Sequence, residues 1–169
     1  MANSHLLMSC GLVVKTPEQK KWLEKYIPLI GCAEELFHAD DDEDDEYPLL
    51  TELKEEAEKV GGLYLCDEIQ ECLYQDEPGP ELSIEAEEGQ EYLWVHSDEG
   101  IPTLSSLVSL LRIFYLKFDI DVPFAMQWAE ICDRPRLDEF GGGAVVVSKN
   151  NAKWMSTGTW VKDVLNGEE

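Results

Sequence analysis

A run of seven consecutive acidic residues, Asp40 to Glu46, most constrains how this chain can fold. Side chains of one charge at this density resist compaction, which predicts an exposed, mobile loop near residues 39–47. The run belongs to a longer acidic stretch, residues 34–99, with 25 Asp and Glu against two Lys. The remaining residues hold 11 acids and 11 bases, so the whole formal net charge of -23 arises in the middle of the chain.

This charge distribution constrains the partners. An anionic surface repels DNA and RNA phosphates and attracts a basic protein or a cation. We therefore expect a non-catalytic protein-binding module that engages a basic protein. One form is an adaptor; a sharper form is an inhibitor or immunity-like protein that imitates nucleic-acid phosphates. A further interpretation is that the charge only keeps the protein soluble. The candidate partner-binding residues are Asp40, Asp41, Asp42, Glu43, Asp44, Asp45 and Glu46.

Length and composition predict one domain over residues 1–169, because 169 residues with 44% apolar content suffice for one core. No stretch approaches the roughly 20 apolar residues of a membrane span, so no membrane association is expected. The five cysteines are an odd number without a Cys-x-x-Cys pair, which favours reduced thiols in the cytoplasm. The sequence indicates no cofactor and no metal site. It leaves the oligomeric state open.

The first half of the chain predicts a strand, two helices and one ambiguous segment. Residues 5–14 are apolar with β-branched residues at the end, as in a strand. Thr16-Pro17 is a typical helix start, and Gly31 is the expected stop. Residues 47–60 suit a second helix, closed by Gly61-Gly62. Residues 63–74 fit a helix or a strand.

The second half predicts a hairpin, a helix and further strands. After a turn at residues 78–80, apolar and polar residues alternate from Leu82 to Ala86, and residues 92–96 form the second hairpin strand. Thr103 is the expected cap of an apolar helix. Strands are expected at 124–131, 144–148 and 153–155, and a short helix at 159–165. This order predicts an α+β fold: a single layer of antiparallel or mixed sheet covered on one face by at least two helices.

The densest local signal for a ligand lies between two of these strands. Arginine forks and glycine N–H groups bind phosphate or carboxylate, which makes this segment a candidate anion site of a small enzyme or ligand-binding domain. The other interpretation is a simple connection, because phosphate-binding glycine loops run into a helix and this one runs into a strand. The candidate residues are Arg134, Arg136, Gly141, Gly142 and Gly143.

The last part of the chain resembles a family of small uncharacterised bacterial and mobile-element proteins. The resemblance rests on a strand containing Trp128, a Cys-x-Arg-Pro-Arg segment with Asp133 at its second position, and a Phe-Gly-Gly-Gly-Ala strand. It covers about the last 45 residues, judged on glycine turns and strand periodicity. The resemblance implies no activity, ligand or site.

Other motifs are weaker. A calcium-binding loop starting at Asp41 fails because Glu46 takes the position that requires glycine. His96, on a hairpin strand, is expected to be half-exposed and has no nucleophile beside it in the sequence. The tryptophans stand in periodic segments and are expected in the core: Trp22, Trp94, Trp128, Trp154 and Trp160.

Overall fold

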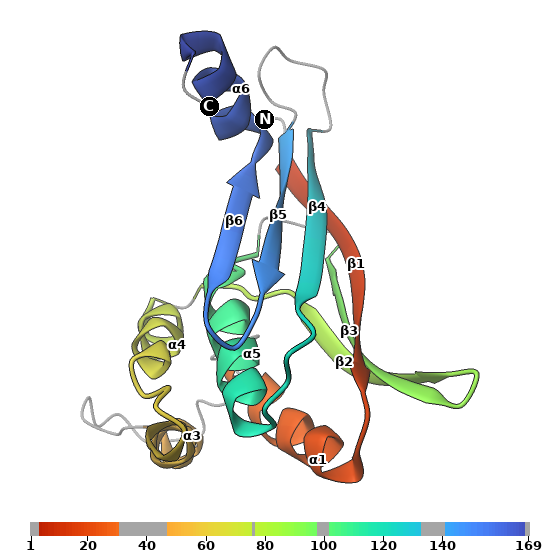
Figure 1. The fold of residues 1–169 in the computed structure, drawn as a ribbon, viewed down its shortest axis with the longest axis vertical. Coiled ribbons are helices and arrows are strands. Elements are labelled where there is room, and N and C mark those ends of the chain that lie inside the picture. Colours follow the sequence, from red (N-terminus) through yellow and green to blue (C-terminus); the bar gives the residue numbers. More distant parts are fainter. Residues whose placement is uncertain (1–3, 31–46, 76, 98–101, 133–140, 168–169) are drawn as a thin grey trace.

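The computed structural model describes residues 4–30, 47–75, 77–97, 102–132 and 141–167. The acidic run Asp40–Glu46, with its expected mobile loop, lies outside these residues, as do Arg134 and Arg136. Figure 1 shows the fold. Its elements are β1 (Ser4–Val14), α1 (Pro17–Tyr26), the 3-10 helix η1 (Ile27–Ile30), α3 (Pro48–Lys59), α4 (Leu65–Tyr74), β2 (Glu81–Glu87), β3 (Gln90–Ser97), α5 (Ser105–Lys117), β4 (Phe124–Cys132), β5 (Gly141–Val147), β6 (Ala152–Ser156) and α6 (Thr157–Asn166).

The six strands form one sheet in the order β2-β3-β1-β4-β5-β6, and all neighbours are antiparallel. β1 connects the two halves of this sheet. Its first residues, Ser4–Leu7, pair with β4, and Met8–Val14 pair with the β2-β3 hairpin through β3. The α+β class is confirmed, and the sheet is antiparallel rather than mixed.

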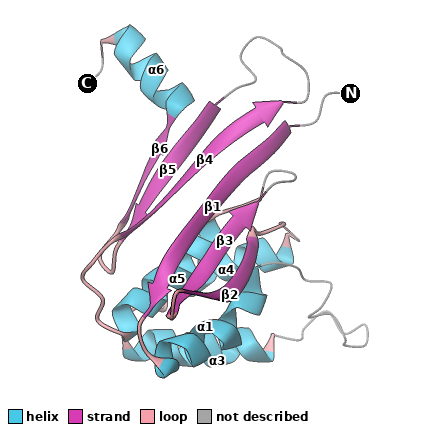
Figure 2. Ribbon diagram, turned by 90° about the vertical axis from the view of Figure 1, so that its right-hand side faces the viewer, coloured by secondary structure: helices cyan, strands magenta, loops and turns pink. Residues whose placement is uncertain are grey.

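Helices α1, α3, α4 and α5 lie on one face of the sheet, and no described helix covers the other face (Figure 2). Alternation along the strands creates the core, because successive side chains point to opposite faces. Leu12 and Val14 of β1 are buried, whereas Val13 between them is exposed. Helix α5 contributes most to this core, with nine buried residues, among them Leu107, Leu111 and Phe114.

Helix α1 begins as predicted. The Thr16 hydroxyl accepts a hydrogen bond from the Gln19 N–H (3.2 Å), and Pro17 takes the first helical position. The α-helix ends at Tyr26, earlier than the predicted stop at Gly31, which lies outside the described residues. Pro28 explains the early end, because its ring leaves no N–H to donate the next helical hydrogen bond. The chain continues as η1.

The ambiguous segment 63–74 contains helix α4. Its buried residues are spaced three and four apart, which places them on one side of a helix. That side packs against α5. The turn before α4 contains Gly61 with a φ of 74°, a left-handed conformation in which glycine is strain-free. The buried residues of α4 are Leu65, Cys66, Ile69, Cys72 and Leu73.

The predicted cap of the fifth helix is wrong. Leu104, not Thr103, is the N-cap residue of α5, and no side chain caps this end. The Thr103 N–H instead donates to the Pro78 carbonyl (2.7 Å). This bond ties the entry of α5 to the segment at residues 78–80. The helix is held by burial of its apolar side chains rather than by a capping side chain.

The end of the sheet that carries α6 extends beyond the other helices (Figures 1 and 2). The position of this end and the uncovered face of the sheet together explain why the prediction of buried tryptophans fails. Trp22 is buried, but Trp94, Trp154 and Trp160 are exposed by 38%, 50% and 60%. Trp94 lies on the uncovered face, and Trp154 and Trp160 lie on β6 and α6, away from the described helices α1, α3, α4 and α5 (Figure 1). Trp128 is half-buried.

Candidate functional site

The three glycines of the predicted anion site lie in strand β5. They pair with Trp128, Ala129 and Glu130 of β4, so they are not the connection that the sequence suggested. A Cβ at Gly141 would lie 2.9 Å from Glu130 Oε2. This puts a carboxylate next to the glycine, which opposes an anion there. Because both arginines lie outside the described residues, anion binding by this segment stays a prediction.

The indole of Trp128 crosses β5 and gives the glycines their structural role. A Cβ at Gly143 would lie 2.3 Å from Trp128 Cζ2, and one at Gly142 would lie 2.5 Å from the Trp128 carbonyl oxygen. Trp128 Nε1 donates to Glu130 Oε1 (3.3 Å). Its ring meets Trp154 edge-on, with 6.1 Å between centroids. The segment thus builds an aromatic pair on the same side of the sheet as the helices.

The uncovered side of the sheet, here called the open face, is a more extended surface than the glycine segment of β5. Strand register assigns its side chains, because directly paired residues of neighbouring strands point to the same side. None of the outward side chains of the four central strands is Asp, Glu, Lys or Arg. They are His5, Leu7, Ser9, Gly11, Val13, Gln90, Tyr92, Trp94, His96, Ala125, Gln127, Ala129, Ile131, Gly142, Ala144 and Val146.

An aromatic cluster marks the centre of the β3 side of this face. The rings of Trp94 and His96 stack with centroids 3.9 Å apart and an interplanar angle of 23°. Trp94 Nε1 donates to Ser9 Oγ on β1 (2.9 Å), which fixes the indole across two strands. Tyr92 lies over Gly11, where an added Cβ would meet its ring at 3.5 Å. The expectation that His96 is half-exposed is confirmed.

Charged residues border this centre on strand β2. Glu81, Glu85 and Glu87 pair with His96, Tyr92 and Gln90, so the three carboxylates lie on the open face. All three glutamates are exposed, and Glu81 Oε2 is 3.4 Å from His96 Nε2. On the opposite edge, the charged side chain on the open face is Lys153 of β6. The face therefore has an uncharged middle and an acidic border on its β2 side.

Lysines from the neutral ends of the chain reach part of the acidic stretch. Lys20 pairs with Glu91, and Lys25 pairs with Glu52. Lys117 Nζ donates to Glu56 Oε2 (2.8 Å), which also accepts from Trp22 Nε1 (2.7 Å). These contacts link the helices and the hairpin. None of these three lysines pairs with a glutamate of β2.

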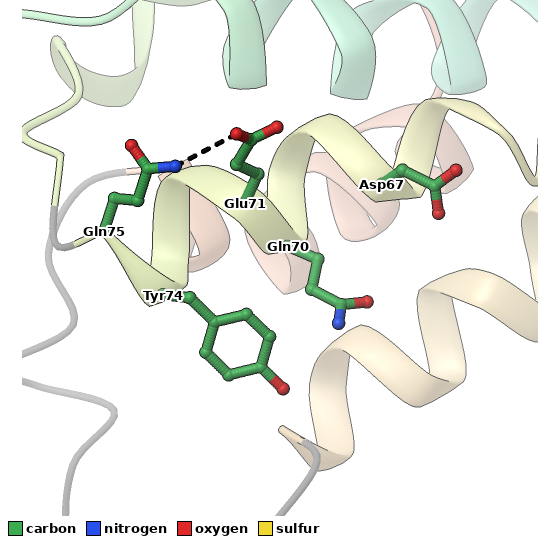
Figure 3. A pocket seen from close by; sticks show the side chains of 5 residues that line it. All are labelled: Asp67, Gln70, Glu71, Tyr74 and Gln75. Atoms are coloured by element: carbon green, nitrogen blue, oxygen red, sulfur yellow. Dashed lines mark hydrogen bonds between the residues drawn. The ribbon is translucent and has the colours of Figure 1, made fainter.

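A shallow polar hollow lies along α4 (Figure 3). Its side chains are two carboxylates, two amides and one phenol, and Gln75 Nε2 donates to Glu71 Oε1 (3.0 Å). Within the described ranges, no group of three or more His, Cys, Asp or Glu side chains is arranged to hold a metal ion. The hollow is lined by Asp67, Gln70, Glu71, Tyr74 and Gln75.

Cys66 and Cys72 of α4 are buried free thiols. Burial raises the pKa of Cys66 to about 11, and burial also raises the pKa of Cys72. A thiol nucleophile needs the opposite shift, because the thiolate is the reactive form. Cys66 and Cys72 therefore serve packing between α4 and α5 rather than chemistry.

No protein-family model, no curated protein and no solved structure matches this chain. Among the helices that the structure describes, none has the length and apolarity needed to cross a membrane. The open face was missed from the sequence, although a signal existed. Residues 5–14 carry no Asp, Glu, Lys or Arg on either side of the strand, in a chain with 29% charged residues.

Proposed function

We propose that this chain is a non-catalytic protein-binding module that receives a basic protein on its open face. The proposal rests on the outward side chains of the four central strands, none of which is Asp, Glu, Lys or Arg. A solvent-facing surface in a chain with 29% charged residues would ordinarily carry several charges. Charged residues are depleted and aromatic residues enriched at the cores of protein interfaces, which is the composition found here.

The aromatic cluster supplies the affinity in this proposal. Trp94 is 38% exposed and is held by its stack on His96 and its bond to Ser9. A fixed, partly exposed indole loses little conformational freedom on binding, and tryptophan is prominent among residues that dominate binding energy. The partner therefore presents an apolar patch that covers this side chain.

The glutamates of β2 favour a partner with positive charge. Glu81, Glu85 and Glu87 stand on a paired strand, so their backbone positions form a regular row beside the uncharged centre. The net charge of -23 attracts a basic protein over a distance, and the row selects lysines or arginines at its border. An inhibitor that imitates nucleic-acid phosphates requires such a row, which supports that form of the proposal.

The test compares two triple variants with equal net charge. One removes the β2 row (Glu81→Gln, Glu85→Gln, Glu87→Gln), and its control removes three exposed helix carboxylates (Glu55→Gln, Glu58→Gln, Glu68→Gln). Trp94→Ala tests the apolar centre. Proteins captured from lysate at low salt are quantified for each variant, after circular dichroism shows that each variant is folded.

We expect the wild type and the helix triple to capture the same basic protein at low salt. The β2 triple and Trp94→Ala should lose it, and high salt should weaken capture, because salt screens exposed charges. Equal losses with both triples would show that only total charge matters. Capture that survives Trp94→Ala would remove the open face from the interface.

A further inference from the structure

The two edges of the sheet differ in how they are protected against pairing with another strand. An edge strand offers unpaired N–H and C=O groups, and proteins block such edges with charge. The β2 edge carries Glu81, Glu85 and Glu87, so two copies of this edge repel each other. The β6 edge (Ala152–Ser156) has one charged residue, Lys153, and is paired on one side by β5 in the part of the chain described. β6 is the edge left open.

Helix α6 adds an apolar stripe next to this edge. It follows β6 directly and none of its residues is buried. Trp160, Val161, Val164 and Leu165 recur at a spacing that places them on one side of the helix, while Lys162 and Asp163 point elsewhere. Leu165 is 81% exposed. A stripe of this kind ordinarily faces another packed element, and here nothing in the described structure covers it.

The charge near β6 and α6 indicates which kind of partner can cover the surface that they form. The described residues from β4 to α6 hold two acids, Glu130 and Asp163, and three lysines, Lys149, Lys153 and Lys162. Over residues 124–169 the full sequence holds seven acids and five bases, a net charge of -2, so this part of the chain is close to neutral. Two copies of a chain with a net charge of -23 can approach here without the repulsion that acts between their acidic regions. A basic partner, in contrast, is attracted to the acidic regions.

We propose that β6 and α6 form a homodimer interface, in which β6 pairs antiparallel with β6 of a second copy about a two-fold axis at Trp154. This register uses the whole strand, with Ala152 opposite Ser156 and Lys153 opposite Met155 of the second copy. A register centred on Lys153 would put the two lysines face to face, which is unfavourable. A closed two-fold contact of this kind uses the same patch on both copies.

The exposed apolar side chains supply the area that such a dimer needs. From their exposed fractions, the six apolar residues of β6 and α6 offer roughly 600 Å² in each copy, or about 1,200 Å² together. This lies at the lower end of stable protein interfaces. The open face of the four central strands stays free in each copy, so the dimer does not depend on the proposed function. The six residues are Trp154, Met155, Trp160, Val161, Val164 and Leu165.

The two-fold axis permits a charge-swap test at Trp154. In Trp154→Lys or Trp154→Glu alone, like charges would face each other across the axis, and sedimentation equilibrium should show monomers. An equimolar mixture of the two variants places Lys opposite Glu and should restore the dimer. The control is the same pair of substitutions at Val122, which is 67% exposed and lies between α5 and β4; each should dimerise like the wild type.

A second variant avoids disturbing the ring contact between Trp154 and Trp128. Leu165→Asp changes an 81% exposed side chain, so it should leave the fold intact and raise the dimer dissociation constant about tenfold or more. A wild type that stays monomeric at every concentration would overturn the proposal. So would a Trp154→Lys or Leu165→Asp variant that dimerises normally, or a Lys and Glu mixture that stays monomeric.

Discussion

The indole of Trp128 occupies the space above Gly143, where an added Cβ would lie 2.3 Å from Trp128 Cζ2 and 2.6 Å from the Met155 carbonyl oxygen. Real Cβ atoms do not approach other atoms this closely. Relief would require a shift of a half-buried indole on one strand and of the backbone of another. The glycine and the tryptophan are therefore one structural unit, and neither can be changed without regard to the other.

Gly143→Ala should destabilise the protein by about 2–3 kcal/mol, because it overpacks a filled position and forces the backbone to move. Urea unfolding followed by circular dichroism measures this loss. The matched control is Gly158→Ala in α6, where an added Cβ meets nothing closer than Ser156 Oγ at 3.8 Å. The control should keep or slightly raise stability. A Gly143→Ala variant as stable as the wild type would contradict the packing described.

Two threonines stand near the starts of helices, but only one of them caps: the Thr16 side chain caps α1, and the Thr103 side chain does not cap α5. Thr16→Ala should cost about 1 kcal/mol, because it removes the acceptor of the Gln19 N–H at the start of α1. Thr103→Ala should cost much less, because no side chain caps α5. Thermal or urea unfolding of both variants checks this order. Equal losses would mean that Thr103 has a capping role that the structure does not show.

Signals within a few residues of one another sufficed to predict much of the fold. Thr16 and Pro17 predict the start of α1, and the alternation from Leu82 to Ala86 predicts the first strand of the hairpin. In both places the deciding interactions are local: a side chain bonds a backbone group three residues on, or the strands are joined by a short turn. The α+β class follows from the order of these elements.

Contacts between distant residues decided what the sequence left open. Helix α4 is fixed by the burial of residues such as Ile69 and Leu73 in the layer with α5, which a segment that fits either structure cannot reveal. The glycines 141–143 suggested a connection because the ring that crosses them belongs to Trp128, on another strand.

The extent of the candidate site was missed for a related reason. An uncharged row on four strands becomes visible only when their register is known. Ser9 and Trp94, for example, are 85 residues apart and share a hydrogen bond. The acidic run predicted for partner binding remains a prediction, because it lies outside the described residues.

The buried thiol of Cys66 should react slowly with Ellman's reagent in the folded protein. Burial raises its pKa to about 11, so at pH 8 about one molecule in a thousand carries the thiolate. Cys66→Ser should therefore leave the number of rapidly reacting thiols unchanged in native buffer. In urea the same variant should show one thiol fewer than the wild type, which is the internal control. Loss of a fast-reacting thiol in native buffer would contradict the burial of Cys66.

Glu56 joins three helices, since its carboxylate accepts from Trp22 of α1 and Lys117 of α5 while the residue itself belongs to α3. Burial acts to raise the pKa of Glu56, but the hydrogen bonds from Lys117 and Trp22 outweigh it, and the pKa lies below its usual 4.5. A lowered pKa in the folded state stabilises the fold above the unfolded value. That contribution is lost as the pH falls through the folded pKa.

Glu56→Gln should thus lower the free energy of unfolding by about 1–2 kcal/mol at pH 7, because two hydrogen bonds lose their charged acceptor. The difference from the wild type should shrink as the pH falls below about 4.5, where the wild-type carboxylate takes up its proton as well. Urea unfolding at a series of pH values measures both effects. Glu55→Gln, which removes an exposed carboxylate one residue away, should differ little from the wild type throughout. A Glu56→Gln deficit that stayed constant down to about pH 3 would show that the carboxylate contributes through shape rather than charge.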